Sequence, residues 1–452
     1  MATGSQMGNP NRGSSRIDSE RPCEYPEMKP ADDLHPPYRW LLLSGLCSIY
    51  FTFGLLVMSI PPLVGEIRAD LGLSRSAMGL AIGAWPLIYI VSSPVCGQLL
   101  DRLGVRRGIA LGSLVMAASG FLRASAGGLG SFWLAIALFG LGGPLVSAGA
   151  PKVVGLWFVD ERERRLAIGF YSAVPAIGGI AALVLSNSVL MPLTGSWRTT
   201  IVIETVMVVL ALVVWLVISG RGPEPPLSTR PATTGSNSPR FLLASSEFRL
   251  ILLLGVGVFF IFHGLAGWLP EVLREHSGFS SMAAANWVAL GAFVGVVCVL
   301  VLPSRTERQK LATTMAVVLA LIAVAVLAVV WLPTWLIPIP VAIAGGRSVL
   351  LPLIQVALLE SEPVGPNNTG LASGLWFGVA EIGGVAGPLV VGWVADTSAG
   401  FAGAFGVVAA VCVVMLLPIS RLHRLTRGGV GLITPSPQVG PGDGRTQEHD
   451  DH

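Results

Sequence analysis

Residues 97–107 read GQLLDRLGVRR, a polar and basic stretch between two long apolar segments. Asp101 and Arg102 lie at its centre, and Gly104 separates them from the basic pair Arg106 and Arg107. The apolar segments on both sides are close to the roughly 20 residues that a helix needs to cross the hydrocarbon core of a bilayer. The stretch therefore predicts a short loop between two membrane-spanning helices.

The composition of the whole chain also indicates a membrane protein. Of its 452 residues, 52% are hydrophobic and 12% are charged, whereas a soluble domain carries about 25% charged residues. The mean hydropathy is +0.71. The N-terminal stretch is polar and does not form a secretory signal, and the five cysteines form no CxxC pair. We therefore expect no disulfide framework, no metal and no other cofactor.

Twelve apolar runs are long enough to cross a membrane. They are 40–60, 76–100, 108–126, 131–154, 166–191, 199–220, 250–270, 284–302, 311–331, 335–359, 369–395 and 400–420. They predict an all-α protein of two six-helix bundles, at 39–220 and 248–422. The Pro-, Ser- and Thr-rich residues 221–247 predict a cytoplasmic linker, and residues 1–38 and 423–452 predict disordered cytoplasmic tails.

The positions of the basic residues predict the orientation. If the N-terminus is cytoplasmic, 22 of the 29 Lys and Arg residues fall on cytoplasmic segments and five on the opposite side. Cytoplasmic segments of membrane proteins carry such an excess of Lys and Arg. Both termini are therefore predicted to be cytoplasmic, at a plasma membrane or a bacterial inner membrane.

The loop at 97–107 resembles the signature loop of the major facilitator superfamily, which has the same order of Gly, Asp, Arg, Gly and a basic pair. Two sets of six helices with a central linker match that family too, so the resemblance covers about residues 39–422. It implies the major facilitator fold and a secondary transporter rather than an enzyme. The residues that match the signature are Gly97, Asp101, Arg102, Gly104, Arg106 and Arg107.

The spacing of this loop has a physical interpretation. Gly97 allows two helices to pack closely, and Asp101 is an anion suited to the N-terminus of another helix. The resemblance implies that the partner is the helix that begins near Thr369. The arginines can pair with the acidic residues of 160–163 and latch the cytoplasmic side shut. Alternatively, they serve only as topology determinants.

Two helices carry glycine and proline at corresponding positions of the two halves. Small residues allow close approach, and proline frees a backbone carbonyl. The pattern resembles the Gly/Pro motif of the family's antiporters and indicates either a gating hinge or ordinary helix packing. The residues are Pro175, Gly178 and Gly179 in the fifth helix and Gly387 and Pro388 in the eleventh.

Two charged residues fall near the middle of predicted spans, Arg347 in the tenth and Glu381 in the eleventh. A charge at the bilayer centre costs about 2.5–3.5 kcal/mol, so such residues are candidates for function. In one interpretation, Arg347 binds an anionic group of the substrate and Glu381 carries a coupling proton. In the other, the two form a structural ion pair.

Three further ionisable residues are weaker candidates for substrate binding or coupling. His263 lies in the seventh helix, as a proton relay or a packed core residue. Glu204 in the sixth helix is six residues from Arg198 and can extend toward it. Lys152 lies near the inner end of the fourth helix and can extend to the cytoplasm.

Residues 120–123, 151–158, 267–270 and 387–396 resemble the cyanate and nitroimidazole transporter-like branch of the superfamily. This implies a small, anionic organic solute that is moved by alternating access and driven by protons or exchange. The expected partners are this substrate, the lipid bilayer and a coupling proton, with no nucleic acid. We expect a monomer.

Two alternatives remain at this point. Export of a drug or metabolite by an antiporter is favoured by the fifth-helix motif, although Ile136 occupies the fourth helix where drug antiporters of the family often carry an arginine. A transporter-like membrane sensor would need an added signalling domain, and the tails are short.

Overall fold

The computed structural model describes residue 4 and residues 36–158, 160–221, 239–361 and 364–429. The first half contains α1 (Pro36–Val57), η2 (Pro61–Leu63), α2 (Val64–Leu71), α3 (Arg75–Ile82), α4 (Ala84–Ala124), α5 (Leu129–Trp157), α6 (Glu161–Leu185), η3 (Ser186–Leu190), α7 (Met191–Thr194) and α8 (Trp197–Ser219). The second half contains α9 (Pro239–Ala244), α10 (Ser246–Glu275), α11 (Ser281–Arg305), η4 (Arg308–Lys310), α12 (Leu311–Trp331), η5 (Thr334–Leu336), α13 (Pro338–Gly345), η6 (Gly346–Val349), α14 (Leu350–Leu359), α15 (Gly365–Ala395) and α16 (Gly400–Gly429).

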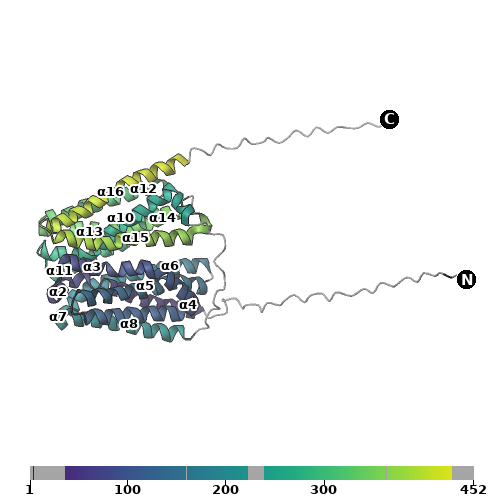
Figure 1. Cartoon of the computed structure of the whole chain (residues 1–452), viewed down its shortest axis with the longest axis horizontal. Coiled ribbons are helices and arrows are strands. Elements are labelled where there is room, and N and C mark those ends of the chain that lie inside the picture. Colours follow the sequence, from purple (N-terminus) through teal and green to yellow (C-terminus); the bar gives the residue numbers. More distant parts are fainter. Residues whose placement is uncertain (1–3, 5–35, 159, 222–238, 362–363, 430–452) are drawn as a thin grey trace.

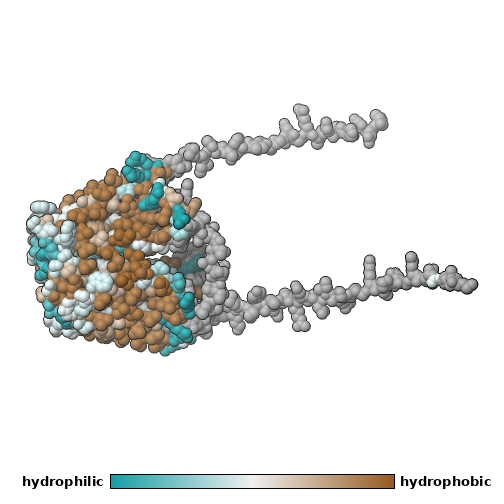
Figure 2. Space-filling model, in the orientation of Figure 1, coloured by the Kyte–Doolittle hydropathy of each residue, from teal (hydrophilic) through white to brown (hydrophobic). Residues whose placement is uncertain are grey.

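The described residues contain twelve helical segments that are long and apolar enough to cross a membrane. The prediction of an all-α, twelve-span protein is thereby confirmed. Hydrophobic residues cover the middle of the molecule, and hydrophilic residues gather at its two ends (Figure 2). This distribution is what a bilayer requires, because its core offers no hydrogen-bond partners to polar side chains.

The helices form two groups that lie one above the other. Elements α1–α8 occupy the lower group and α10–α16 the upper group (Figure 1). One hydrophobic core lies within the lower group and includes Leu46, Phe139 and Trp215. A second, larger core fills the upper group and extends across to Ile67 and Met78 of the first half. The halves are therefore packed together where α2 and α3 lie.

Helix ends are set by local signals. Five side chains, those of Ser74, Asp160, Ser196, Ser245 and Ser280, accept a hydrogen bond from the backbone N–H three residues later and cap α3, α6, α8, α10 and α11. Such caps satisfy N–H groups that have no partner within the helix. These caps therefore fix where five of the twelve candidate spans begin.

The two ends of the bundle are distinguished by what they carry. We call the end that holds Pro36 and the C-terminal end of α16 the tail face, and the end that holds Arg75 and Glu275 the far face (Figure 1). Part of the stretch predicted as a linker is helical, since α9 lies within it, and α16 continues beyond residue 422 to Gly429. Most of the predicted tails and linker lies outside the described residues.

Candidate functional site

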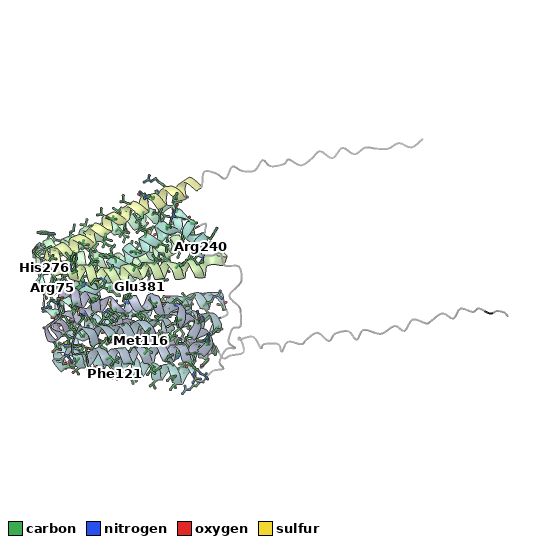
Figure 3. All side chains as sticks on the ribbon, in the orientation of Figure 1. Arg75, Met116, Phe121, Arg240, His276 and Glu381 are labelled. Atoms are coloured by element: carbon green, nitrogen blue, oxygen red, sulfur yellow. The ribbon has the colours of Figure 1, made fainter. Side chains whose placement is uncertain are left out.

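Glu381 lies midway along α15, between Arg75 at the far face and Arg240 at the tail face (Figure 3). It is only 7% exposed, and within the described residues its Oε2 atom has no hydrogen-bond partner. A buried carboxylate without a partner is costly in an apolar medium. It is therefore suited to bind a proton or a ligand.

His263 of α10 meets the same point of α15. Its Nδ1 atom and Oε2 of Glu381 both lie against Gly384, where a side chain would displace them. The imidazole Nδ1 lies 3.2 Å from the carbonyl oxygen of Phe259. The ring of Trp85, from the other half, packs edge-on against it with centroids 5.5 Å apart. The site therefore lies where the two halves meet.

Arg347 lies in η6, a short 3-10 segment in the middle of the tenth span. It is 8% exposed, and one of its terminal nitrogens donates to the carbonyl oxygen of Ala344 at 3.1 Å. Its guanidinium carbon lies 5.3 Å from the ring centroid of Phe262, next to His263 in the sequence. Its Nε atom has no partner within the described residues. Irregular turns within a span often mark functional positions.

Arg347 and Glu381 do not form the ion pair that one sequence interpretation offered. Within the described residues, no salt bridge joins the two, although both are buried in the same half. The arginine contacts its own helix and an aromatic ring, and the Oε2 atom of the glutamate faces Gly384 and His263. Each charged group therefore has unused hydrogen-bonding capacity.

Aromatic side chains surround this site from the first half as well. The hydroxyl groups of Tyr89 and Ser147 are hydrogen-bonded, and the Tyr50 hydroxyl donates to the carbonyl oxygen of Ser147 at 3.1 Å. Tyr89 is close enough to Glu381 for the charge of that carboxylate to act on its hydroxyl group. On the other side, Phe377 is one turn from Glu381 on α15 and is 41% exposed. The surroundings are thus largely aromatic, with few polar groups.

Glu204 and Lys152 lie elsewhere. Glu204 is fully buried in the first half and accepts a 2.6 Å hydrogen bond from the Ser186 hydroxyl. It does not extend toward Arg198, which pairs instead with Asp70. That expectation was wrong because the carboxylate packs inward. Lys152 is half-buried in α5, five residues before its tail-side end.

A network of ion pairs joins the two halves at the far face. Arg68 contacts Glu271 and Glu275, each at 3.2 Å. Arg75 contacts Glu275 at 2.5 Å and Asp396 at 3.9 Å. We call these five residues the far-face network. The arginines belong to the first half and the carboxylates to the second, so the network joins the two halves at this end.

Asp396 also caps a helix of the opposite half. Its two carboxylate oxygens accept the backbone N–H groups of Arg75 at 3.0 Å and Ser76 at 2.7 Å, at the start of α3. Partial burial opposes ionisation of Asp396. The hydrogen bonds from Ser76 and Arg75 and the charge of Arg75 outweigh it and hold the pKa of this carboxyl below its ordinary value. The N-terminal end of α3 thus binds the ionised form of Asp396.

Comparison with known proteins identifies the family. A family model described as Major Facilitator Superfamily matches residues 46–363. The chain belongs to the major facilitator superfamily. It is therefore a multi-pass membrane transporter by family and not an enzyme, as the signature loop predicted.

Relatives within this superfamily cover nearly the whole chain. The Uncharacterized transporter YycB of Bacillus subtilis (strain 168) is 25% identical over 370 residues, 78% of this chain and 86% of that protein. The Hexuronate transporter of the same organism is 24% identical over 419 residues, 87% of this chain and 95% of that protein. A crystal structure of a bacterial homologue of the human lysosomal transporter Spinster has a TM-score of 0.67 at 19% identity, over 89% of this chain and all of that one.

The contacts observed in the superfamily signature loop differ in part from those predicted. Gly104 has a φ of 77° and breaks α4 between two spans, a left-handed conformation that favours glycine. Among the described residues the close packing predicted at Gly97 is absent, because none of their atoms lies within 4 Å of the position that a side chain would occupy there. The side chains of Asp101 and of residues 365–371, in the first turns of α15, lie outside what the structure describes.

The predicted partners of the signature arginines have other contacts. Glu163 pairs with Arg39 at 2.8 Å, and Asp160 caps its own helix by accepting the N–H of Glu163 at 2.9 Å. Arg106 lies against Gly220, and its carbonyl oxygen accepts a 3.1 Å hydrogen bond from Trp215. The pairing of the loop with Glu163 was therefore wrong for this conformation. Glu161 lies outside the described side chains.

The Gly/Pro positions are points of close helix contact. A side chain at Gly178 of α6 would collide with the carbonyl oxygen of Phe51 in α1. One at Gly387 of α15 would fall on the backbone of α10, 3.0 Å from the nitrogen of Gly264. The two halves therefore use the same device, α6 against α1 and α15 against α10. A gating role for Pro175, Gly179 and Pro388 stays a prediction.

Sequence reasoning missed the far-face network and the burial of Arg123. Arg68, Arg75 and Arg123 are among the five basic residues that the predicted orientation places on the side opposite the cytoplasm, and no partners were predicted for them. A signal was available, because Glu271, Glu275 and Asp396 fall at the same predicted end of other helices. Opposite charges at matching depth in the two halves are a pattern that one sequence can reveal.

Proposed function

We propose that the protein moves a small organic anion with an apolar or aromatic body across the membrane by alternating access. Arg347 binds the anionic group, Glu381 carries a coupling proton, and His263 lies beside that proton. The observation that carries the proposal is the presence of two buried charged groups with unsatisfied atoms, within aromatic surroundings where the halves meet.

Binding of an anionic substrate would offset the unfavourable free energy of burying the Arg347 guanidinium group. A guanidinium group binds a carboxylate through two parallel hydrogen bonds, and such charge-assisted bonds are about twice as strong as neutral ones. In the described part of the chain, the Nε atom of Arg347 has no hydrogen-bond partner. The relative named Hexuronate transporter fits an organic acid as the cargo.

A proton is the simplest partner for Glu381. Protonation removes the charge of a carboxyl that is buried without a cation, and so removes most of its desolvation cost. Loss of the proton would favour a state in which water reaches Glu381. This alternation couples proton binding to the conformational cycle, which is the role that intramembrane carboxylates have in transporters.

The aromatic surroundings favour an apolar body over a polyhydroxylated one. Trp85, Phe262 and the exposed Phe377 present ring surfaces near the charged groups. Sugar acids would require many hydrogen-bond partners for their hydroxyl groups, because an unpaired polar group is costly in a buried site. Ring surfaces instead bind flat apolar groups.

We also place the tail face in the cytoplasm, because most basic residues lie there. The far-face network then closes the outer side in the conformation described, and it must open when the tail face closes. Ion pairs between the halves suit this cycle because they form and break as units, which makes each conformation a discrete state.

Transport in proteoliposomes tests the proposal. With benzoate as the first probe, Arg347→Lys is expected to abolish uptake and exchange while expression and folding stay normal. Glu381→Gln is expected to retain benzoate exchange but lose uptake driven by a pH gradient. Normal transport by Arg347→Lys would refute the anion role, and normal gradient-driven uptake by Glu381→Gln would refute the coupling role.

Efflux of a lipophilic cation is the second candidate, because aromatic rings also attract cations and Glu381 is a carboxylate. The two candidates separate in a counterflow panel of benzoate, glucuronate, tartrate and tetraphenylphosphonium. Exchange of tetraphenylphosphonium alone would select the second candidate. Preference for glucuronate over benzoate would keep the anion and reject the apolar body.

A further inference from the structure

A groove of about 510 Å³ opens between the tail-side ends of α10 and α16. Its lining combines two chemistries, the basic side chains of Arg249, Arg421 and Arg424 and the apolar ones of Leu250, Leu253 and Leu425. It is separate from the site between the halves, because it lies at the tail-side ends of helices of the second half alone.

The arginines of the groove lack carboxylate partners in the described part of the chain. Arg249 donates to the Ser246 hydroxyl at 3.0 Å, and Arg424 donates weakly to the carbonyl oxygen of Ser420 at 3.4 Å. All three arginines are exposed. Three cations that converge on one hollow repel each other, so an anion between them would be stabilising.

The groove lies at the depth where two candidate membrane spans end. Two candidate spans, Ser246–Glu275 and Gly400–Leu425, each end at this groove. The arginines therefore lie at the level of lipid headgroups. Leu253 is 47% exposed and extends one turn further into the apolar zone. A ligand of this groove has a charged end at the boundary and an apolar end in the hydrocarbon.

We propose that this groove binds an anionic phospholipid. Its phosphate lies among Arg249, Arg421 and Arg424, and an acyl chain runs along Leu250 and Leu253. Basic pockets between membrane helices bind anionic headgroups in this way. A free phosphate would satisfy the arginines but would leave the leucines without a partner, which favours the lipid.

The groove differs from a simple excess of positive charge. Arginines that only set topology need no common target, and several others on the tail face, such as Arg162, Arg221 and Arg305, lie outside the groove. Here, residues more than 170 positions apart in the sequence meet at one hollow with an apolar floor. The lipid would hold α10 against α16, and α10 also carries His263.

Native mass spectrometry of the purified full chain tests the proposal, with phosphatidylglycerol and phosphatidylcholine as probes. The wild type is expected to retain phosphatidylglycerol selectively. The triple variant R249Q/R421Q/R424Q is expected to lose this selectivity, and each single change to weaken binding about fivefold. The matched control R162Q/R221Q/R305Q removes the same charge outside the groove and should bind as the wild type does.

Three outcomes would overturn the proposal. These are equal loss in the groove and control variants, equal retention of the two lipids by the wild type, and a thermal shift with inorganic phosphate as large as that with phosphatidylglycerol. If the triple variant does not fold, the single variant R421Q and the conservative R249K/R421K/R424K replace it. The conservative variant should retain phosphatidylglycerol, and failure to do so while folded would also count against the proposal.

Discussion

Apart from the far-face network, each half of the molecule buries an arginine and a glutamate, but it uses them differently. In the first half, Arg123 donates to the carbonyl oxygen of Leu56 at 2.8 Å and to the Ser59 hydroxyl at 3.4 Å, and its guanidinium carbon lies 5.4 Å from the ring centroid of Phe139. It thereby ties α4 to α1 and α5. Glu204 is the charged group close enough to act on it.

The second half leaves Arg347 and Glu381 with fewer partners. Each of the four buried groups has one atom without a partner among the described residues. Arg123 nevertheless bonds to α1 and Glu204 to Ser186, whereas Arg347 bonds only within its own span and contacts one ring. The same residue types thus serve architecture in one half and remain available to ligands in the other. Burial alone does not separate the two roles, whereas the identity of the contacting helices does.

The largest expected effect is on stability in the first half. Arg123→Met should lower the free energy of unfolding by about 3 kcal/mol, because it leaves Glu204 buried without a compensating charge. The measurement is the loss of the monodisperse peak after heating in detergent. Arg347→Met is the matched control and should change this stability little. Equal losses in the two variants would remove the distinction between the halves.

The next effect concerns ligand affinity in the second half. Arg347→Met should weaken binding of the best anionic ligand by about 30-fold or more, which corresponds to about 2 kcal/mol. Isothermal titration of purified protein measures it. Arg123→Met, studied below its melting temperature, should bind with nearly wild-type affinity. A larger loss in that variant would place the anion site in the first half.

A smaller effect is expected where the halves join at the far face. Asp396→Ala removes a cap on α3 and a partner of Arg75, at a cost of about 1 kcal/mol to the closed form. A single cysteine introduced at Ser76 should then react about fivefold faster with maleimide. Labelling at an unchanged rate would show that Asp396 does not hold this end closed.

Acid should act in the same direction as Asp396→Ala. The closed form holds Asp396 with a lowered pKa, so it binds fewer protons than an open form with the ordinary value of about 3.9. Its stabilisation is complete above that value and is lost as the pH falls through the lowered pKa. The labelling rate at position 76, divided by the rate of a free thiol at the same pH, should rise below about pH 4 in the wild type and rise less in Asp396→Ala.

The smallest effect is expected at Gly97. Gly97→Ala should leave the melting temperature within about 1 °C, because the added carbon meets open space and alanine favours the helix. Gly178→Ala, its counterpart at a close contact, should lower the melting temperature clearly. Equal tolerance at both positions would contradict the packing described for α6 and α1.

Much of the fold followed from the sequence because hydropathy and charge act locally. Twelve apolar runs, the loop at 97–107 and the glycines of α6 and α15 each leave a mark within a few residues. Contacts between distant segments leave no such mark. The proximity of His263 to Glu381 depends on how α10 packs against α15, and the pairing of Arg68 with Glu271 depends on two halves meeting.

The structure also shows an aspartate that caps a helix at a place where the sequence did not indicate one. An aspartate at a helix N-terminus was expected from Asp101 toward α15. The described contact of this type runs from α15 itself, where Asp396 caps α3 at the opposite end. The contact of Asp101 stays a prediction, because its side chain lies outside the described residues. The contact of Asp396 with α3 could not be read from residue types.

Glu381 of α15 and Asp396, the residue directly after this helix, lie 15 residues apart, which corresponds to about 22 Å of helix. This segment begins at the candidate site and ends at Asp396, which is hydrogen-bonded to the first half. A ligand that displaces Glu381 therefore shifts α15 and changes the solvent-exposed contact between Asp396 and the start of α3. A fluorophore on a cysteine at position 76 would report occupancy as a change in brightness, so the carrier could serve as its own ligand detector without any measurement of flux.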